Sequence, residues 1–207
     1  MPMHALKEWA VTCAALGAGE QVVVLRKGGI HEKRFELPYR TFFLFPTFAH
    51  QRPDLVQPRW HDAYAQALDA RDEPNQRSLG LLAELIEAHA ITDSGFLPAL
   101  GPFHVLSADY AAERLRWRRT QPLWVLVLRV FGVPNPPIIT LRPEDARCNS
   151  WFELPESISS PVGLTPVIDD AMFAAKRAEL AGALAGSSAR PLDVAEEPVG
   201  ASLESPG

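Results

Sequence analysis

Cysteine is scarce in this 207-residue sequence, which contains only Cys13 and Cys148. The two are far apart and form no Cys-x-x-Cys pair, which excludes a disulfide-stapled fold and a thiolate zinc centre. The six histidines also lack the spacing of a metal-binding pair. We therefore expect no metal site and no cofactor.

Long hydrophobic runs are lacking too. The longest, residues 122–131, has the length of a strand and about half the length that a membrane-spanning helix needs. The N-terminus has no signal-peptide pattern, because Lys7 and Glu8 interrupt its apolar stretch. We expect a cytoplasmic protein with reduced cysteines and no membrane segment.

Positive charge is not in excess, since 20 basic residues stand against 25 acidic ones. This balance argues against a protein that coats nucleic acid through overall charge alone. Residues 183–207 have one arginine and four carboxylates and no apolar period, which predicts a disordered acidic tail. Residues 1–182, with ordinary hydrophobic content, are expected to form a single globular domain.

The basic residues are mostly arginines, 16 of the 20, and they cluster around one tryptophan. Arginines interleaved with an aromatic ring are suited to contact phosphates and to stack on a base. The alternative is a solvated helix end, where cations complement the helix dipole. The cluster consists of Arg114, Arg116, Trp117, Arg118 and Arg119.

Apolar residues recur at helical spacing in four segments. The first segment is followed by Gly17 and Gly19, which we interpret as a C-cap. The last is expected to bury Met172, Phe173 and Leu180. The predicted helices span residues 6–16, 60–68, 108–117 and 169–182.

The strongest predicted strand, residues 122–131, is apolar on both faces and should therefore be internal to a sheet. Its one exception is Arg129, which must either be paired or line a cleft. Residues 138–141 form another predicted strand, which two preceding prolines limit to a sheet edge. Residues 150–154 add a short extended segment.

Residues 21–27, 34–37 and 41–45 have the pattern of a β-meander. The chain turns after Lys27 at Gly28 and Gly29, and this segment has two interpretations. The ammonium group and the backbone N–H groups are able to hold an anion, or the segment is a plain hairpin turn.

Residues 78–93 fit both a helix and a strand, because their apolar residues satisfy both spacings. Propensity alone favours the helix.

A proline ends the strand at residues 41–45, and Thr47, His50 and Gln51 follow it. Binding residues commonly lie at such a rigid exit, although a helix-capping turn with a surface histidine fits equally. His50 and His104 are the candidate acid–base residues. A nucleophile pair of Cys148 with either histidine competes with a buried structural thiol.

Several segments of the sequence are informative as a set: Ala5-Leu6-Lys7-Glu8-Trp9-Ala10, Leu25-Arg26-Lys27-Gly28-Gly29-Ile30, Leu44-Phe45-Pro46-Thr47, Pro102-Phe103-His104-Val105, Arg114-Leu-Arg-Trp117, residues 122–131 and Cys148-Asn-Ser-Trp151. Together they resemble the bacterial family called domain of unknown function 1802. The resemblance covers about residues 3–182 and implies a strand at residues 78–93. Members of the family are similar to modules fused with restriction-endonuclease-like domains, which implies a DNA restriction or defence setting and a partner of that kind.

The order of elements is also similar to small PUA and ASCH barrels, which bind modified bases or RNA. We therefore expect an α+β fold with a curved, mostly antiparallel sheet or a small PUA/ASCH-like barrel, flanked by N- and C-terminal helices. This is an analogy of fold, and fold alone does not imply function.

Three functions fit these observations. The first is a nucleic-acid-binding accessory module for DNA or RNA, with the clustered arginines on phosphates and residues 45–51 lining a base-sized pocket beside Lys27 and Arg129. The second is a small enzyme for a nucleotide-like or other anionic substrate, with His50 or His104 as acid or base and Lys27 or Arg129 as anion clamps. The third is a non-catalytic domain whose basic face binds an acidic protein.

Overall fold

The computed structural model describes residues 2–27, 36–69, 76–117, 119–142 and 149–185. The strands are β1 (His4–Trp9), β2 (Val23–Arg26), β3 (Thr41–Thr47), β4 (Gln76–Ser78), β5 (Leu81–Ile91), β6 (Leu123–Gly132), β7 (Ile138–Thr140), β8 (Trp151–Glu153) and β9 (Thr165–Pro166). The helices are α1 (Ala10–Gly17), α2 (His61–Asp69), α3 (Leu97–Leu100), α4 (Ala108–Arg116) and α5 (Asp170–Ala183), with 3-10 turns η1 (Pro53–Leu55), η2 (Pro58–Trp60), η3 (Ser94–Phe96) and η4 (Gly101–Phe103). Within these described residues, no helix has both the length and the apolar character needed to cross a membrane.

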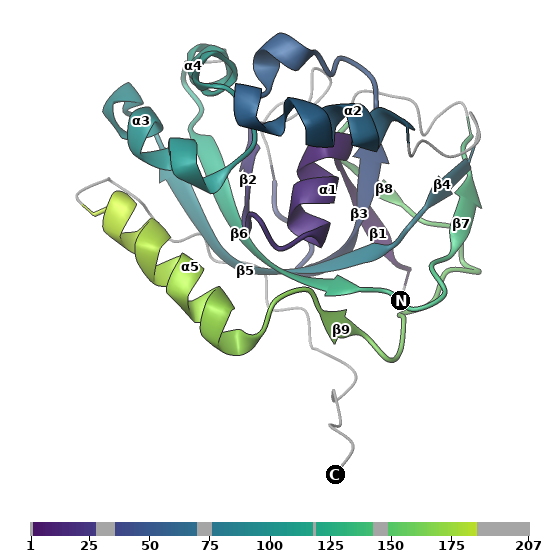
Figure 1. Cartoon of the computed structure of the whole chain (residues 1–207). Coiled ribbons are helices and arrows are strands. Elements are labelled where there is room, and N and C mark those ends of the chain that lie inside the picture. The colour runs from purple at the N-terminus through teal and green to yellow at the C-terminus, as the bar shows by residue number, and fades with distance from the viewer. Residues whose placement is uncertain (1, 28–35, 70–75, 118, 143–148, 186–207) are drawn as a thin grey trace.

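One strongly curved sheet dominates the fold (Figure 1). Its strand order is β2-β6-β5-β3-β1-β8, and β9 pairs with β6 beyond the end of β2. All pairs in this sheet are antiparallel except β1 with β3, and β4 and β7 form a separate two-stranded sheet. The predicted α+β fold with a curved, mostly antiparallel sheet is confirmed.

The two faces of the sheet carry different helices. On the concave face, Phe42 and Leu128 belong to one buried cluster with Leu16 of α1. On the opposite face, Val125 shares a cluster with Phe173 of α5. Figure 1 accordingly shows α1 enclosed by the sheet and α5 outside it. Strand β6 is buried between these layers and pairs on both edges, which confirms its predicted internal position.

The predicted helix at residues 6–16 is wrong in its first half. Residues His4–Trp9 form β1, and α1 begins at Ala10. Ala5 and Leu6 are both fully buried, because β1 lies between β3 and β8 with a packed cluster on each face. Strand pairing overrides the helical spacing of the apolar residues here.

The predicted β-meander is also wrong. Strand β2 pairs with β6, and β3 lies between β5 and β1. The reason is that the long apolar β6 has two edges to pair, of which β5 takes one and β2 the other. Residues 28–35, which include part of the predicted meander, lie outside the described residues.

Residues 78–93 contain a strand, β5, as the family resemblance implies, where propensity favours a helix. The ladder with β6 has an irregularity between Leu85 and Glu87, which shifts the side-chain alternation. Both faces of β5 are also covered, so Leu82, Leu85, Ala88 and Ile91 are buried at intervals of three residues. Burial at every third residue is close to the period of an amphipathic helix, which explains why the sequence pattern also fits a helix.

Helix α5 buries Phe173 and Leu180 as predicted, but the prediction for Met172 is wrong, because this side chain is 49% exposed. Met172 lies in the first turn of α5. There the carboxylate of Asp169 accepts a hydrogen bond from the N–H of Met172 and anchors the backbone.

The predicted tail at residues 183–207 lies outside the described residues from residue 186 onward.

Gly19 follows α1 with a φ of 73°, and its N–H donates to the carbonyl of Leu16, which confirms part of the predicted C-cap. A Cβ atom at this position would overlap Cγ2 of Ile168. We expect Gly19→Ala to lower the free energy of unfolding by more than about 1 kcal/mol, measured by urea denaturation. In the control Gly80→Ala, the new Cβ meets no atom within 4 Å, and stability should change by less than about 1 kcal/mol. Equal stability of the two variants would contradict this expectation.

Candidate functional site

The two ends of the curved sheet meet where β1 and β2 end. The pairing of β1 with β8 stops at Leu6 and Trp151. Beyond that point the guanidinium of Arg26 donates to the carbonyl of Lys7 at 3.0 Å and to Oγ of Ser150 at 2.6 Å. The N–H of Lys7 also donates to the carbonyl of Ser150 at 2.9 Å, so one backbone hydrogen bond and the side-chain bonds of Arg26 together close the sheet.

We call Lys7, Glu8, Arg26 and Ser150 the seam cluster. The carboxylate of Glu8, 4% exposed, accepts hydrogen bonds from the N–H of Trp9 at 2.8 Å and from Arg26 at 3.3 Å. A buried ion pair of this kind persists only with good geometry and further hydrogen bonds. The seam cluster is therefore a buried, hydrogen-bonded polar network inside the fold.

Neutral groups surround the seam cluster. Burial, and next the negative charge of Glu8, raise the pKa of the Cys13 thiol well above its ordinary value. Burial also raises the pKa of Tyr110, an effect that the positive charge of Arg114 partly opposes. Cys13 and Tyr110 therefore stay protonated at neutral pH, and neither is an activated nucleophile.

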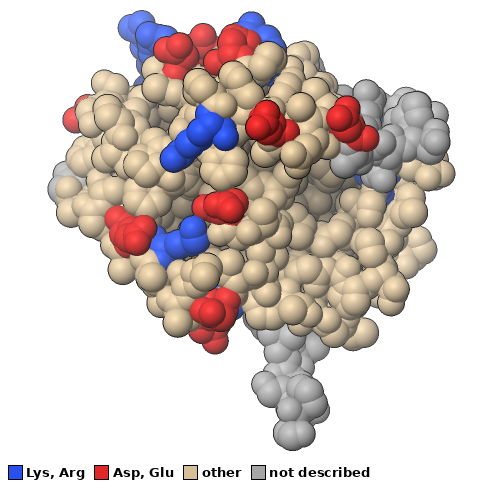
Figure 2. All heavy atoms as spheres, viewed as in Figure 1, with Lys and Arg blue, Asp and Glu red and all other residues tan. Residues whose placement is uncertain are grey.

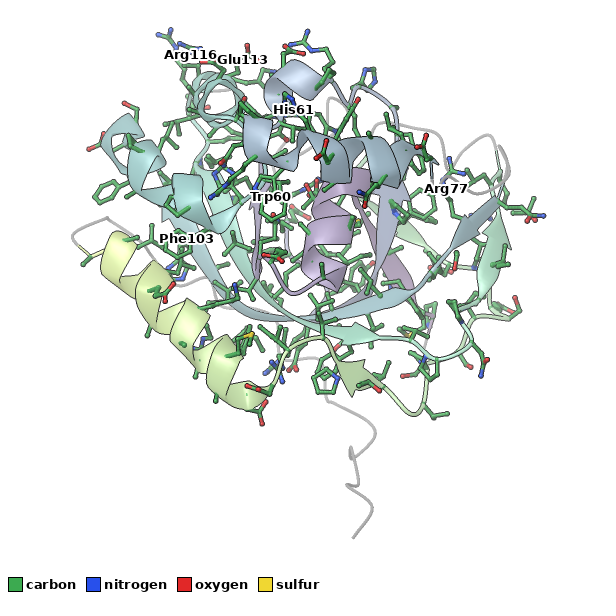
Figure 3. The ribbon with its side chains drawn as sticks, viewed as in Figure 1. Trp60, His61, Arg77, Phe103, Glu113 and Arg116 are labelled. Atoms are coloured by element: carbon green, nitrogen blue, oxygen red, sulfur yellow. The ribbon has the colours of Figure 1, made fainter. Side chains whose placement is uncertain are left out.

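The predicted arginine cluster lies at the end of α4. The guanidinium of Arg114 stacks over the rings of Tyr110 and Trp117, at 5.1 and 5.7 Å from their centroids. Arg116 and Arg119 are exposed, and Figure 3 shows Arg116 projecting outward from α4. Among the residues that the structure describes, no carboxylate forms an ion pair with these three arginines. We call Arg114, Arg116 and Arg119 the arginine surface.

Charges of both signs share the face of the molecule seen in Figure 2. Basic side chains stand at the top of that view, near α4 and α2, with acidic side chains between them. One of the acidic residues of α4 is the exposed Glu113, labelled beside Arg116 in Figure 3. The arginine surface therefore lies among charges of both signs.

The predicted pocket beside both Lys27 and Arg129 is wrong, because the structure places the two side chains far apart. Lys27 is buried, which lowers the pKa of its ammonium group, and Nζ donates to the carbonyl of Leu115 at 2.5 Å. Arg26, the residue before Lys27, pairs with Trp124. Arg129 lies five residues further along β6, a rise of about 17 Å.

Arg129 is paired, which is one of the two interpretations that its sequence context allows. Its guanidinium donates to the carboxylate of Asp170 at 2.7 Å and to the carbonyl of Asp169 at 3.3 Å, both at the start of α5. These contacts hold α5 against the outer face of the sheet.

The exit after β3 contributes two contacts to the interior. Oγ1 of Thr47 donates to the carbonyl of Glu8 at 3.1 Å, and Oε1 of Gln51 accepts from the N–H of Val11 in the first turn of α1. His50 is exposed in a turn with a φ of 62°. Four predicted residues lie outside the described part of the chain: Gly28, Gly29, Arg118 and Cys148.

His104 is buried, with 3% of its surface exposed, and neither ring nitrogen has a hydrogen-bond partner among the described residues. Burial, and to a lesser extent the positive charge of Arg59, lowers the pKa of His104 to about 4. A backbone contact at Leu106 acts in the opposite direction. The imidazole is therefore neutral at pH 7 and enclosed. The described residues also include no group of three potential ligands able to hold a metal ion.

A cleft of about 250 Å³ lies between α1 and α2, and we call it the α1–α2 cleft. Pro46 and Phe48 line it, so the predicted pocket at residues 45–51 coincides with it in part. Lys27 and Arg129 do not line it. The cleft joins the seam cluster through Cys13, whose sulfur lies 4.0 Å from the carbonyl oxygen of Glu8.

Sequence reasoning missed Glu8, Arg26 and Tyr110 as members of a site. The available signal was the pair Lys7 and Glu8 inside an otherwise apolar stretch, because charged residues in a segment that is buried must find partners. Arg26 carried a similar signal at the end of an apolar strand.

The family model described as Domain of unknown function (DUF1802) matches residues 5–179. The chain belongs to this family. The match confirms the resemblance found in the sequence, and it includes the seam cluster, α4 and most of α5 of this DUF1802 domain.

A search of the curated proteins finds no match to this chain. Similar solved structures are crystal structures of the ASCH protein from Zymomonas mobilis. The unsubstituted protein has a TM-score of 0.39 and 15% identity, and the match covers 70% of this chain and 90% of that chain. A serine-to-alanine mutant of it has a TM-score of 0.40 and 15% identity, with 70% and 94% covered. A tyrosine-to-phenylalanine mutant has a TM-score of 0.38 and 16% identity, with the same coverage of 70% and 94%.

Proposed function

We propose that this DUF1802 domain is a nucleic-acid-binding module that contacts phosphates through the arginine surface. The observation that carries the proposal is that no described carboxylate forms an ion pair with Arg114, Arg116 or Arg119. Guanidinium groups without a carboxylate partner are available to bind phosphate oxygens in a bidentate manner.

The arginine surface is also held in place. Cation–π contacts with the rings of Tyr110 and Trp117 restrict the Arg114 guanidinium. The buried ammonium group of Lys27 binds the carbonyl of Leu115, in the last turn of α4, and so fixes the end of the helix. A preorganised surface of this kind loses less entropy when it binds a ligand.

The test is the salt dependence of binding. We expect the full chain to bind labelled oligonucleotides, with an association constant that falls as salt concentration rises. The double variant Arg116→Ala/Arg119→Ala should bind more weakly, and the slope of log K against log salt should become shallower by about 1.4–1.8, because each arginine neutralises one phosphate. Single- and double-stranded DNA and RNA are compared by fluorescence anisotropy.

The matched control is Arg40→Ala, since Arg40 is partly exposed and already pairs with Glu84 at 3.2 Å. This variant should bind as the unchanged protein does. An unchanged salt slope in the double variant, or an equal loss in the control, would overturn the assignment of the arginine surface.

We extend the proposal to a DNA restriction or defence setting, in which the domain serves as an accessory module to a restriction-endonuclease-like protein. The support is the family resemblance stated from the sequence. Co-purification of such an endonuclease with the full chain after nuclease treatment is the expected result, and its absence from the native host extract would remove this extension.

The two alternatives predict different results. An enzyme that uses His50 or His104 with Lys27 and Arg129 needs these groups at one substrate, whereas Lys27 contacts α4 and Arg129 contacts α5. A domain that binds an acidic protein through the arginine surface would capture its partner equally well with nucleic acid removed.

A further inference from the structure

The α1 wall of the α1–α2 cleft is flat. It is formed by one face of α1, and no side chain on that face extends beyond a sulfur or a methyl group. The four residues of this wall are Ala10, Cys13, Ala14 and Gly17.

The residues that line the rest of the cleft are mostly apolar and include an aromatic ring. Pro46 and Phe48, at the end of β3, line it together with Leu44 and Leu81, and Ser78 adds a hydroxyl group. The guanidinium of Arg77 lies over the ring of Phe48, 4.9 Å from its centroid. The cleft is therefore a slot between a smooth helix face and apolar groups, with a cation beside its aromatic wall.

The size of the cleft suits a single ring system. A dry cavity of about 150 Å³ holds a benzene-sized molecule. The α1–α2 cleft, at about 250 Å³, has room for a larger flat ring. On one side the lining residue Cys13 is next to the seam cluster, because its sulfur lies 4.0 Å from the backbone carbonyl oxygen of Glu8.

We propose that the α1–α2 cleft receives one unpaired nucleobase of the bound strand. This inference rests on the proposed function and adds a second contact to it. Figure 1 shows α2 crossing over α1 from the α4 end of the molecule to the β4 end. A strand that follows α2 would have its phosphates at the arginine surface and one base in the slot under Ala67, in the last turns of α2.

The first test uses adenosine and cytidine, which lack phosphates and so report on the slot alone. Saturation-transfer NMR should detect binding of at least one of them to the full chain. The variant Ala14→Leu, which fills the slot from an exposed position on α1, should abolish that signal. The matched control is Ala18→Leu, because Ala18 is exposed just after α1 and does not line the cleft.

The second test compares an oligonucleotide with an abasic strand of equal length and charge. The unchanged protein should bind the complete strand about 5- to 150-fold more tightly, the range expected for stacking of one base. Ala14→Leu should reduce this ratio to about 1, while the slope against salt stays the same.

The outcomes separate the two proposals. Nucleoside binding without salt-dependent binding of oligonucleotides would overturn the proposed function and keep the slot. Salt-dependent binding with no nucleoside signal and a ratio of about 1 would overturn the slot alone. If Ala14→Leu fails to fold, the pair Ala67→Leu and Ala65→Leu on α2 repeats the test, since Ala67 lines the cleft and Ala65 does not.

Discussion

Replacing Arg26 with methionine is expected to lower the free energy of unfolding by about 3–5 kcal/mol. The substitution removes the cation that faces the buried carboxylate of Glu8, and it removes the donors that bind Lys7 and Ser150. An uncompensated buried charge is among the largest single costs in a folded protein. Urea denaturation at neutral pH measures the loss.

Two further variants identify the cause of this loss. Arg26→Met combined with Glu8→Gln should be more stable than Arg26→Met alone, because the amide keeps the hydrogen bond from Trp9 and carries no charge. Arg40→Met, at an exposed ion pair, should cost less than about 1 kcal/mol. Equal stability of the single and double variants at the seam would show that the charge of Glu8 is not the source of the loss.

Lowering the pH from about 7 to about 4 is expected to remove about 3 kcal/mol of stability through His104 alone. Burial lowers the pKa of this imidazole from 6.5 to about 4 in the folded protein. The unfolded chain therefore binds a proton at a higher pH than the folded chain does. The stability is fully present above pH 6.5 and is lost as the pH falls toward 4.

The variant His104→Leu isolates this contribution. It removes the titrating group while it keeps an apolar side chain of similar size in the buried position. The difference in free energy of unfolding between pH 7 and pH 4 should shrink by about 3 kcal/mol relative to the unchanged protein. A His104→Leu variant that keeps the full pH dependence would contradict the expectation.

The sequence predicted those elements whose burial agrees with their local pattern. Residues 122–131 are apolar on both faces, and the structure places β6 between two packed layers. The pattern failed where non-local pairing decided the structure. The spacing at residues 6–16 is helical, yet His4–Trp9 became a strand because β3 and β8 flank it.

The residues of the candidate site also differ in how far the sequence predicts them. The arginines around Trp117 are close together in the sequence, so their cluster is visible there, although their function remains a prediction. Glu8 and Arg26 are 18 positions apart and meet only because the sheet curves until β2 approaches β1. No local spacing encodes such a contact.

The closure of the sheet at β8 also has a consequence for synthesis of the chain on the ribosome. Strand β1 (His4–Trp9) is made first, but its antiparallel neighbour (Trp151–Glu153) emerges only after most of the chain has been translated. Pairings between such distant segments form slowly, because a large loop must close before any contact is gained. Until then, β1 has an open edge, and the charges of Lys7 and Glu8 near its end oppose edge-to-edge association between nascent chains.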